Sequence, residues 1–289
     1  MPRTKGAKNI VALEDRTTIS SSPNSNIRHL SESLNKTELE SFVALMKHQT
    51  NFVHWIVSRH EELLKLKAKG PKDETYRKYR WYVEHMLLLE AINAFEVFYK
   101  RSIVALGTAL APHVPADRVK GNIDMRILWA APPETSASDL IFESRLYHDL
   151  DNIDQATEAL VQKKRYNKNK PPTTLKKRVK TLQAVFQLRH TLSHNHGRLT
   201  ASDSGKLQLL GYSAKIDEII DPSSDYLGDA VRRVLIMEAK DFSNWLLAAT
   251  ADYLQNVHTD TGVTLSRSIF EILEARLGKN TALAALPWV

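Results

Sequence analysis

The sequence contains no cysteine and only ten glycines in 289 residues. Without cysteine the chain has no disulfide bond, no thiolate zinc site and no cysteine nucleophile, as is usual in a reducing compartment. So few glycines argue against a fold rich in strands and tight turns. No apolar run approaches the roughly eighteen residues of a membrane helix, and the N-terminal residues lack the apolar region of a signal peptide. We therefore expect a cytoplasmic protein that does not enter a membrane and is built mainly from helices.

Apolar residues recur every three or four positions over most of the chain, which is the pattern of helices with one buried face. This periodicity predicts long helices over residues 36–69, 73–110, 137–162, 174–196, 226–256 and 265–277, with a short one near 119–129. The only segment that favours a strand is residues 207–212. Residues 1–35 are polar and aperiodic, so we expect a mostly disordered tail there. Residues 36–289 are expected to form one all-α domain, a helical bundle with a short irregular or hairpin insertion after the helix at 174–196.

Positive charge is concentrated in one part of the sequence. The chain carries a net charge of +7, yet no acidic residue lies between Ala159 and Ser202. A basic patch of this kind is typical of a protein with a polyanion partner. The alternative is a lysine-rich loop that interacts only with solvent. Besides Arg189, the interval holds ten basic residues that are candidate nucleic-acid contacts: Lys163, Lys164, Arg165, Lys168, Lys170, Lys176, Lys177, Arg178, Lys180 and Arg198.

The helix predicted at 174–196 ends in the nine residues RHTLSHNHG, which run from Arg189 to Gly197. At about 100° per residue, Arg189 projects into the apolar stripe of this helix, close to the direction of Leu182. A guanidinium in that position needs a partner that compensates its charge. Gly197 is expected to close the helix from the C′ position.

Two glutamates of the helix predicted at 73–110 need a partner as well. Glu90 and Glu96 each lie within an apolar row, so each is expected to have a basic partner. Arg189 is one candidate for that partner. For Glu96, a local pair with Lys100 at i, i+4 is the simpler explanation.

An arginine followed by two histidines offers the groups needed to cleave RNA. Arginine binds phosphate through parallel N–H donors and stays charged, and histidine transfers protons near neutral pH. Hydrolysis through the ribose 2′-hydroxyl needs a base, an acid and a cation beside the phosphate, roles that suit His190, His194 and Arg189. This chemistry needs neither a metal ion nor a cofactor, and we expect neither. A plainer reading is that the histidines only interact with the C-terminal end of the helix dipole.

A metal site is the competing chemical interpretation. His190 and His194 have the i, i+4 spacing of the two histidines in zinc-protease helices. In that motif a catalytic glutamate follows the first histidine, whereas Thr191 occupies the position here and no carboxylate lies nearby in the sequence. The spacing alone therefore gives the metal interpretation little support.

The segment from Arg189 to His194 resembles the Arg-x4-His motif of the HEPN superfamily, in which a polar residue typically follows the arginine. Asn195, His196 and Gly197 resemble the ending of the motif in many bacterial members, and residues 88–96 are similar, less specifically, to an N-terminal HEPN helix. The resemblance is clearest over residues 175–256. It implies a helical domain with the motif at the end of a core helix. Many members are metal-independent ribonucleases of toxin–antitoxin, abortive-infection and CRISPR-linked systems, and many dimerise so that two motifs face one cleft.

The resemblance also implies roles for individual residues. Arg189 would stabilise the scissile phosphate, His194 would be the principal acid or base, and His190 would position the substrate or assist. The residues in supporting positions are Asn195, His196, Glu90 and Glu96. The implied partners are RNA, with tRNA or mRNA as candidate targets, a second copy of the chain, and a cognate antitoxin or defence-system protein.

One residue departs from the pattern of the superfamily, and two other functions remain open. Toxins of this superfamily that are neutralised by adenylylation carry a tyrosine two residues after the motif histidine, and this chain has His196 there, which puts that mode of control in doubt. The chain also fits a non-catalytic HEPN-like module that binds RNA or directs assembly. A scaffold or regulator with no nucleic-acid role is the third interpretation.

Overall fold

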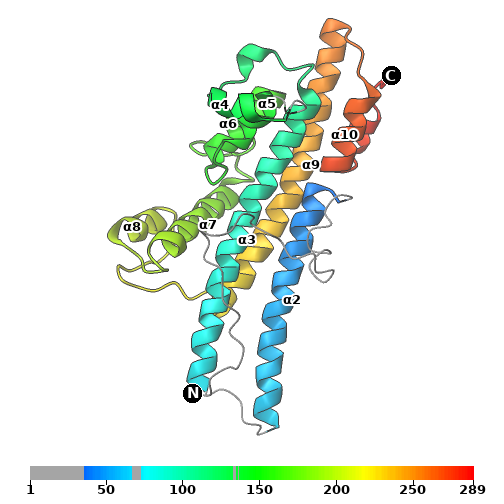
Figure 1. Ribbon diagram of the computed structural model, residues 1–289. Helices are drawn as coiled ribbons and strands as arrows, with labels where there is room; N and C mark the ends of the chain where they lie inside the picture. The colour runs from blue at the N-terminus through cyan, green and yellow to red at the C-terminus, as the bar shows by residue number, and fades with distance from the viewer. Residues whose placement is uncertain (1–35, 67–72, 133–134, 136) are drawn as a thin grey trace. The chain divides into compact units, whose positions relative to one another are not determined.

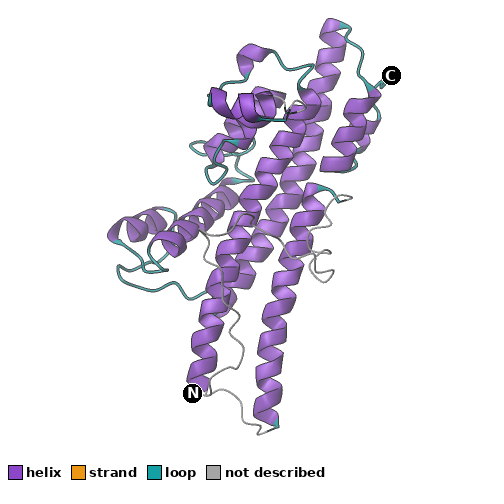
Figure 2. Cartoon of the chain, viewed as in Figure 1, coloured by secondary structure: helices purple, strands orange, loops and turns teal. Residues whose placement is uncertain are grey.

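The computed structural model describes residues 36–66, 73–132, 135 and 137–289 (Figure 1). Within these ranges every regular element is a helix and none is a strand (Figure 2). The predicted all-α fold is therefore confirmed. The tail predicted at residues 1–35 lies outside the described residues.

Three helices are much longer than the others. The three longest are α2 (Glu38–Lys65), α3 (Asp73–Leu110) and α9 (Leu227–Thr261). The others are α4 (Met125–Ala130), α5 (Ala137–Glu143), α6 (Leu150–Val161), α7 (Lys176–His194), α8 (Ala201–Leu209), α10 (Arg267–Leu277) and α11 (Thr281–Ala284), with single 3-10 turns at Ala116–Arg118 and Ser224–Tyr226.

Helix α3 is the centre of the bundle. It packs against α2, α5, α6, α7, α9 and α10, and Figure 1 shows α2, α3 and α9 running alongside one another. Its side chains enter one continuous apolar core, with Leu88, Ile92, Phe95 and Ile103 fully buried. Apolar residues surround this helix on nearly all sides in the sequence, as is typical of a helix packed on several faces.

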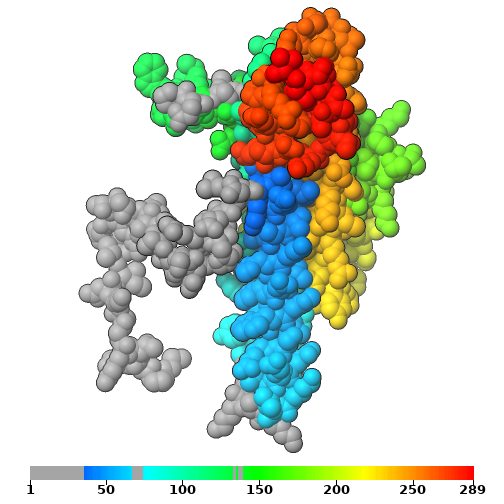
Figure 3. Space-filling view, turned by 90° about the vertical axis from the view of Figure 1, so that its right-hand side faces the viewer, coloured from blue at the N-terminus to red at the C-terminus, as the bar shows by residue number. Residues whose placement is uncertain are grey.

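The C-terminal helices close one end of the bundle. Figure 3 shows α10 and the last residues packed over the start of α2 and beside α9. Arg276 of α10 donates hydrogen bonds of 2.9 and 2.6 Å to Glu38 Oε1 in the first turn of α2. A capping box between Thr37 and Glu40 begins that helix, because each side chain satisfies a backbone N–H that the first turn leaves free.

Helices α7 and α8 lie on one side of the long helices (Figure 1). Helix α7 matches the predicted motif helix to within two residues at each end. The strand predicted at 207–212 is wrong, because a capping box between Thr200 and Asp203 begins α8 at Ala201 and that helix continues to Leu209. Leu207 is buried on that helix. The insertion after the motif helix is thus a short helix followed by an irregular loop that returns through an isolated antiparallel bridge between Arg198 and Ile219.

The helix predicted at 137–162 is in fact two helices, α5 and α6. The break is stabilised by Tyr147, whose hydroxyl donates to the carbonyl oxygen of Phe142 at 2.8 Å. Asp149 then caps α6 by accepting from the backbone N–H of Asp151 at 3.1 Å, which is the role of an N-cap carboxylate. The break brings His148 and Asp149 beside α7, where they form part of the candidate site.

Candidate functional site

The motif lies at the exposed C-terminal end of α7. The helix ends at His194, and the carbonyl oxygen of Thr191 accepts from the backbone N–H groups of both Asn195 and Gly197, at 3.0 and 3.1 Å. His196 occupies the C′ position with φ of 48°, and Gly197 follows with φ of 82°. Gly197 therefore comes one residue later than predicted, and the turn contains two left-handed residues rather than one.

Arg189 is held by two residues of α3. Its Nε–H donates to Asn93 Oδ1 at 2.8 Å, and Nε lies 2.9 Å from Glu96 Oε1. The side chain is 29% exposed, so it lies at the edge of the core instead of inside it. Among the described residues, no hydrogen bond or ion pair engages the two terminal guanidinium nitrogens. The basic partner of Glu96 is therefore Arg189 on the neighbouring helix, and not Lys100 on the same helix.

Glu96 also links Arg189 to a histidine that the sequence did not single out. His148 Nδ1 lies 3.6 Å from Glu96 Oε2, while Arg189 lies beside the other oxygen. Burial raises the pKa of Glu96, and the charges of Arg189 and His148 oppose that rise. No local motif surrounds His148, and only the break between α5 and α6 brings it here.

Glu90 does not join the motif. Its side chain is exposed on α3, and Glu90 Oε2 accepts a hydrogen bond of 3.0 Å from Gln49 Nε2 of α2. The expectation of a basic partner, and of a supporting role beside Arg189, is wrong for this residue. Glu90 is exposed to solvent and needs no counter-ion, while its carboxylate gives the buried amide of Gln49 a hydrogen-bond acceptor.

His190 and His194 are neighbours on the surface of α7. Both are exposed, and their ring centroids are 4.8 Å apart with planes inclined by 47°. One helical turn separates them, so both imidazoles project from the same face of the helix. A ligand bound on that face would therefore meet both rings.

Asn195 connects the motif to α8 through Asp203. Its Nδ2 donates to Asp203 Oδ2 at 3.1 Å, and Gln187 Nε2 donates to Asp203 Oδ1 at 2.8 Å. Asp203 is buried. Burial alone raises its pKa, but hydrogen bonds from Thr200 and Asn195, with the charge of His190, lower that pKa below the ordinary value. Asn195 thus fixes the end of α7 against α8, which is a positioning role.

His196 lies close to a second histidine that sequence reasoning missed. His85 of α3 is buried beneath the turn, and its ring atoms are 3.7 Å from the position that a Cβ on Gly197 would occupy. Burial and the charge of His196 lower the pKa of His85, against a backbone hydrogen bond with Leu192 that raises it. The φ of 82° is what favours glycine at position 197, because an added Cβ would meet the imidazole of His85 only at ordinary van der Waals distance.

The predicted nucleic-acid contacts divide into two groups. Six of the ten form ion pairs with acidic side chains of the same chain: Lys163, Lys164, Arg165, Lys168, Arg178 and Arg198. The other four are exposed and have no ion pair within the described part of the chain: Lys170, Lys176, Lys177 and Lys180. These four lie in the segment before α7 and in its first turns.

Two of the three arginines in the paired group hold the fold together. Arg165 Nε and Arg178 Nη1 each lie 3.0 Å from one carboxylate oxygen of Glu238, a residue of α9 with a fully buried side chain. Tyr166 donates its hydroxyl to Glu238 Oε1 at 2.7 Å, and burial raises the pKa of that hydroxyl well above its usual range. Arg165 and Arg178 therefore fix the segment before α7 onto α9, and both already have a counter-ion within the chain.

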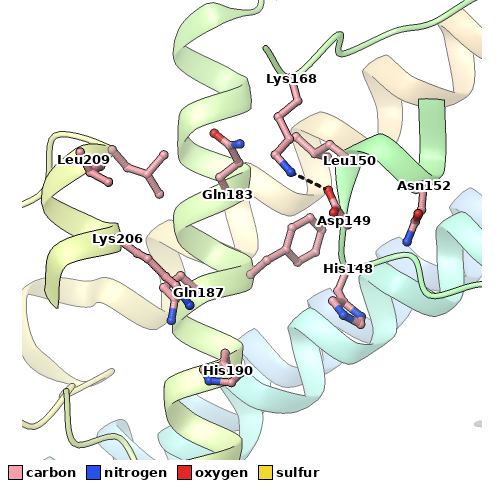
Figure 4. A pocket seen from close by; sticks show the side chains of 12 residues that line it. His148, Asp149, Leu150, Asn152, Lys168, Gln183, Gln187, His190, Lys206 and Leu209 are labelled. Carbon is pink, nitrogen blue, oxygen red and sulfur yellow. Dashed lines mark hydrogen bonds and ion pairs between the residues drawn. The ribbon is translucent and has the colours of Figure 1, made fainter. Parts of the chain in front are cut away.

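A cavity of about 620 Å³ opens beside the motif, between α7, α8 and the start of α6. Figure 4 shows Gln183, Gln187 and His190 along α7, facing His148 and Asp149, with Lys206 and Leu209 of α8 on the other side. We refer to it as the α6–α7–α8 cavity. His190 lines it, so the cavity and the motif share one residue.

Two broader properties concern the described residues as a whole. They contain no group of three or more histidine, aspartate or glutamate side chains arranged to hold a metal ion. No described helix is both long enough and apolar enough to span a bilayer.

Comparisons with protein-family models, with curated proteins and with solved structures found no match to this chain.

Proposed function

We propose that the protein is a metal-independent endoribonuclease of the HEPN type, with Arg189, His190 and His194 as its catalytic residues. The observation that carries the proposal is the way Arg189 is held. Asn93 and Glu96 fix its Nε side, which leaves both terminal nitrogens available. A planar pair of N–H donors on a fixed guanidinium matches two oxygens of a phosphate.

The proposed reaction uses the 2′-hydroxyl of the substrate. His194 accepts the proton of that hydroxyl, and the 2′-oxygen forms a bond to phosphorus while the bond to the 5′-oxygen breaks. An acid protonates the leaving 5′-oxygen, and Arg189 stabilises the negative charge that develops on the phosphate. The products are a 2′,3′-cyclic phosphate and a 5′-hydroxyl. This transfer needs no co-reactant, and the later hydrolysis of the cyclic ester needs only water.

The position of the two histidines favours a dimeric site. Attacking and leaving oxygens lie roughly in line on opposite sides of phosphorus, so the base and the acid must also lie on opposite sides. His190 and His194 project from one face with ring centroids 4.8 Å apart. They cannot flank a phosphate between them. We therefore propose that a second copy of the chain supplies the acid, as the resemblance to dimeric HEPN proteins implies.

The internal ion pairs reduce the number of basic residues that we propose as phosphate contacts. Arg165 and Arg178 are engaged by Glu238, so the unpaired lysines at the start of α7 are the proposed phosphate contacts. Lys176 and Arg189 lie about 20 Å apart along α7 at 1.5 Å per residue. The RNA strand is thus proposed to run along α7 towards the motif. A tRNA or mRNA target and an antitoxin or antiviral setting rest on the resemblance alone, whereas a cytoplasmic location is proposed from the composition of the sequence.

Incubation with tRNA and with total RNA in the presence of EDTA tests this function. We expect cleavage that survives the chelator, that disappears in His194→Ala and that persists in His54→Ala, a matched exposed histidine on α2. Circular dichroism checks that each variant is folded. The absence of cleavage of any RNA by the folded wild type contradicts the proposal. RNA binding without cleavage that depends on Arg189 favours the non-catalytic alternative.

A further inference from the structure

The α6–α7–α8 cavity has the size and lining of a binding site for a small planar group. Its volume is about 620 Å³, within the range of about 300–1,000 Å³ that small-molecule sites usually have. It is open to solvent along one side of α7, next to His190 (Figure 4). We infer that it receives one unpaired nucleobase of the RNA strand, adjacent to the phosphate that is cleaved. This inference rests on the proposed function.

The apolar part of the lining suits the face of a base. Phe186 of α7 lines the cavity together with Leu209, the last residue of α8, and Leu210, which caps that helix. Leu209 is 85% exposed, so its position is not explained by burial in the core. Proteins bind unpaired bases by covering their faces with aromatic and apolar side chains.

The polar part of the lining suits the edge of a base. Gln187 donates its Nε2 to Asp203 Oδ1 at 2.8 Å, which fixes the amide and leaves its oxygen as an acceptor. Gln183, one turn earlier on the same face, makes no hydrogen bond with the described residues. Its amide therefore offers a donor beside an acceptor, the pattern that pairs with the N6 and N7 atoms of adenine. We therefore expect the base to be adenine.

The charged groups around the cavity allow a phosphate to approach. Asp149 is the acidic residue of the lining. Lys168 Nζ lies 3.1 Å from its Oδ1 and also 3.1 Å from Asp151 Oδ2, so this ammonium group offsets part of the charge of the two carboxylates. Lys206 is exposed at the rim and has no ion pair among the described residues. His190 completes the rim, and His148 touches Glu96, which holds Arg189. A base in the cavity would therefore place its own or the next phosphate towards the motif.

Sequencing of the cleavage products from a randomised single-stranded RNA tests the inference. We expect adenine to be enriched at one fixed position beside the cut, and Gln183→Ala to lower the enrichment about tenfold, since a bidentate amide contact is worth roughly 1–3 kcal/mol of discrimination. Gln155→Ala, an exposed glutamine on α6 outside the cavity lining, should leave the enrichment unchanged. An even base distribution, or an enrichment that Gln183→Ala does not alter, overturns the inference.

A binding measurement separates this inference from the proposed function. The folded His194→Ala protein is titrated with 2′-O-methyl hexamers of adenosine and of uridine, which cannot be cleaved through the 2′-hydroxyl. We expect tighter binding of the adenosine hexamer, and loss of the difference when Gln183→Ala is added. If the wild type cleaves no RNA but this difference is present, the endonuclease proposal fails and the base site stands. If the wild type cleaves RNA and the difference is absent, only the base site fails.

Discussion

Arg189 Nε donates its single proton to Asn93 Oδ1 at 2.8 Å and lies 2.9 Å from Glu96 Oε1. The Nε side of the guanidinium is thus tied to α3, while its two terminal nitrogens make no hydrogen bond or ion pair with the described residues. A side chain held in this way loses little further freedom when it binds a ligand, which is the advantage of a pre-organised group. The ion pair between Arg189 and Glu96 also joins α7 to α3. Arg189, which we propose to act on RNA, therefore contributes to the fold as well.

Glu96→Gln is expected to change how stability depends on pH. Burial raises the pKa of Glu96 above its ordinary value of 4.5, although Arg189 and His148 oppose that rise. The folded state therefore holds this proton more tightly than the unfolded state, so the wild type loses stability as pH rises from 4.5 through the raised pKa. The glutamine of the variant cannot ionise, so this dependence on pH is absent from it.

Urea denaturation at several values between about pH 4 and pH 5.5, where a histidine of ordinary pKa is still mostly protonated, measures this effect. The free energy of unfolding of Glu96→Gln should improve relative to the wild type as pH rises. A difference that stays constant over this range, or one that changes in the opposite direction, contradicts the assignment of a raised pKa to Glu96.

The unpaired and paired lysines should differ in their contribution to RNA binding. Lys176 and Lys180 have no ion pair among the described residues, whereas Lys163 and Lys164 face Asp252 and Glu158. Replacing Lys176 and Lys180 together with alanine should weaken binding of single-stranded RNA and reduce the slope of log K against log salt by roughly 0.7 per lost phosphate contact. The matched double variant of Lys163 and Lys164 should change both quantities less. Equal losses in the two variants would show that the ion pairs do not decide which lysines bind RNA.

Glu238→Gln should destabilise the protein strongly. Its carboxylate is fully buried and faces both Arg165 and Arg178. Removing the charge leaves Arg165, which is itself only 7% exposed, without its counter-ion, and breaking a buried pair in this way costs about 3–5 kcal/mol.

Asp252→Asn is the control for this prediction. Asp252 pairs with Lys163 at the surface and its side chain is 61% exposed, so its loss should cost less than about 1 kcal/mol. Chemical denaturation measures both variants. Similar small losses in the two would mean that the cluster around Glu238 does not hold the segment before α7 in place.

The absence of cysteine allows a direct test of the proposed dimer. Ser193 is exposed between His190 and His194, so Ser193→Cys introduces a single thiol at the motif. If two motifs face one cleft, a short bismaleimide should cross-link two copies through this position. Ser268→Cys, at an exposed position in the first turn of α10, should not cross-link. Efficient cross-linking at residue 268 and none at residue 193 would place the interface elsewhere.

The sequence predicted the long helices well, because their stability depends on a repeating apolar pattern that is visible locally. Helix α3 has the predicted bounds, Asp73 and Leu110, and each end of α7 lies within two residues of the predicted end. The strand prediction for residues 207–212 failed, because the capping box of Thr200 and Asp203 outweighs a short apolar segment that favours a strand.

The partners of charged residues were harder to predict than the helices. Glu238 lies 73 residues from Arg165 and 60 from Arg178, and no periodic pattern connects positions so far apart. His148 lies near the motif because of the break between α5 and α6. His85 lies near it because the turn at Gly197 packs on α3. The identity of Arg189 as a charge that needs an acid was predictable, whereas the choice of Glu96 over Glu90 depends on how α3 and α7 cross.

The most direct test of the proposed chemistry is cleavage of a matched pair of RNA oligomers in EDTA. One oligomer contains a site that the protein cuts, and the other carries a 2′-deoxyribose on the 5′ side of that bond. The account predicts that the first is cut to a 2′,3′-cyclic phosphate and a 5′-hydroxyl and that the second is not cut there. Cleavage of the deoxy-substituted oligomer at the same bond, or cleavage that requires a divalent metal ion, would contradict it.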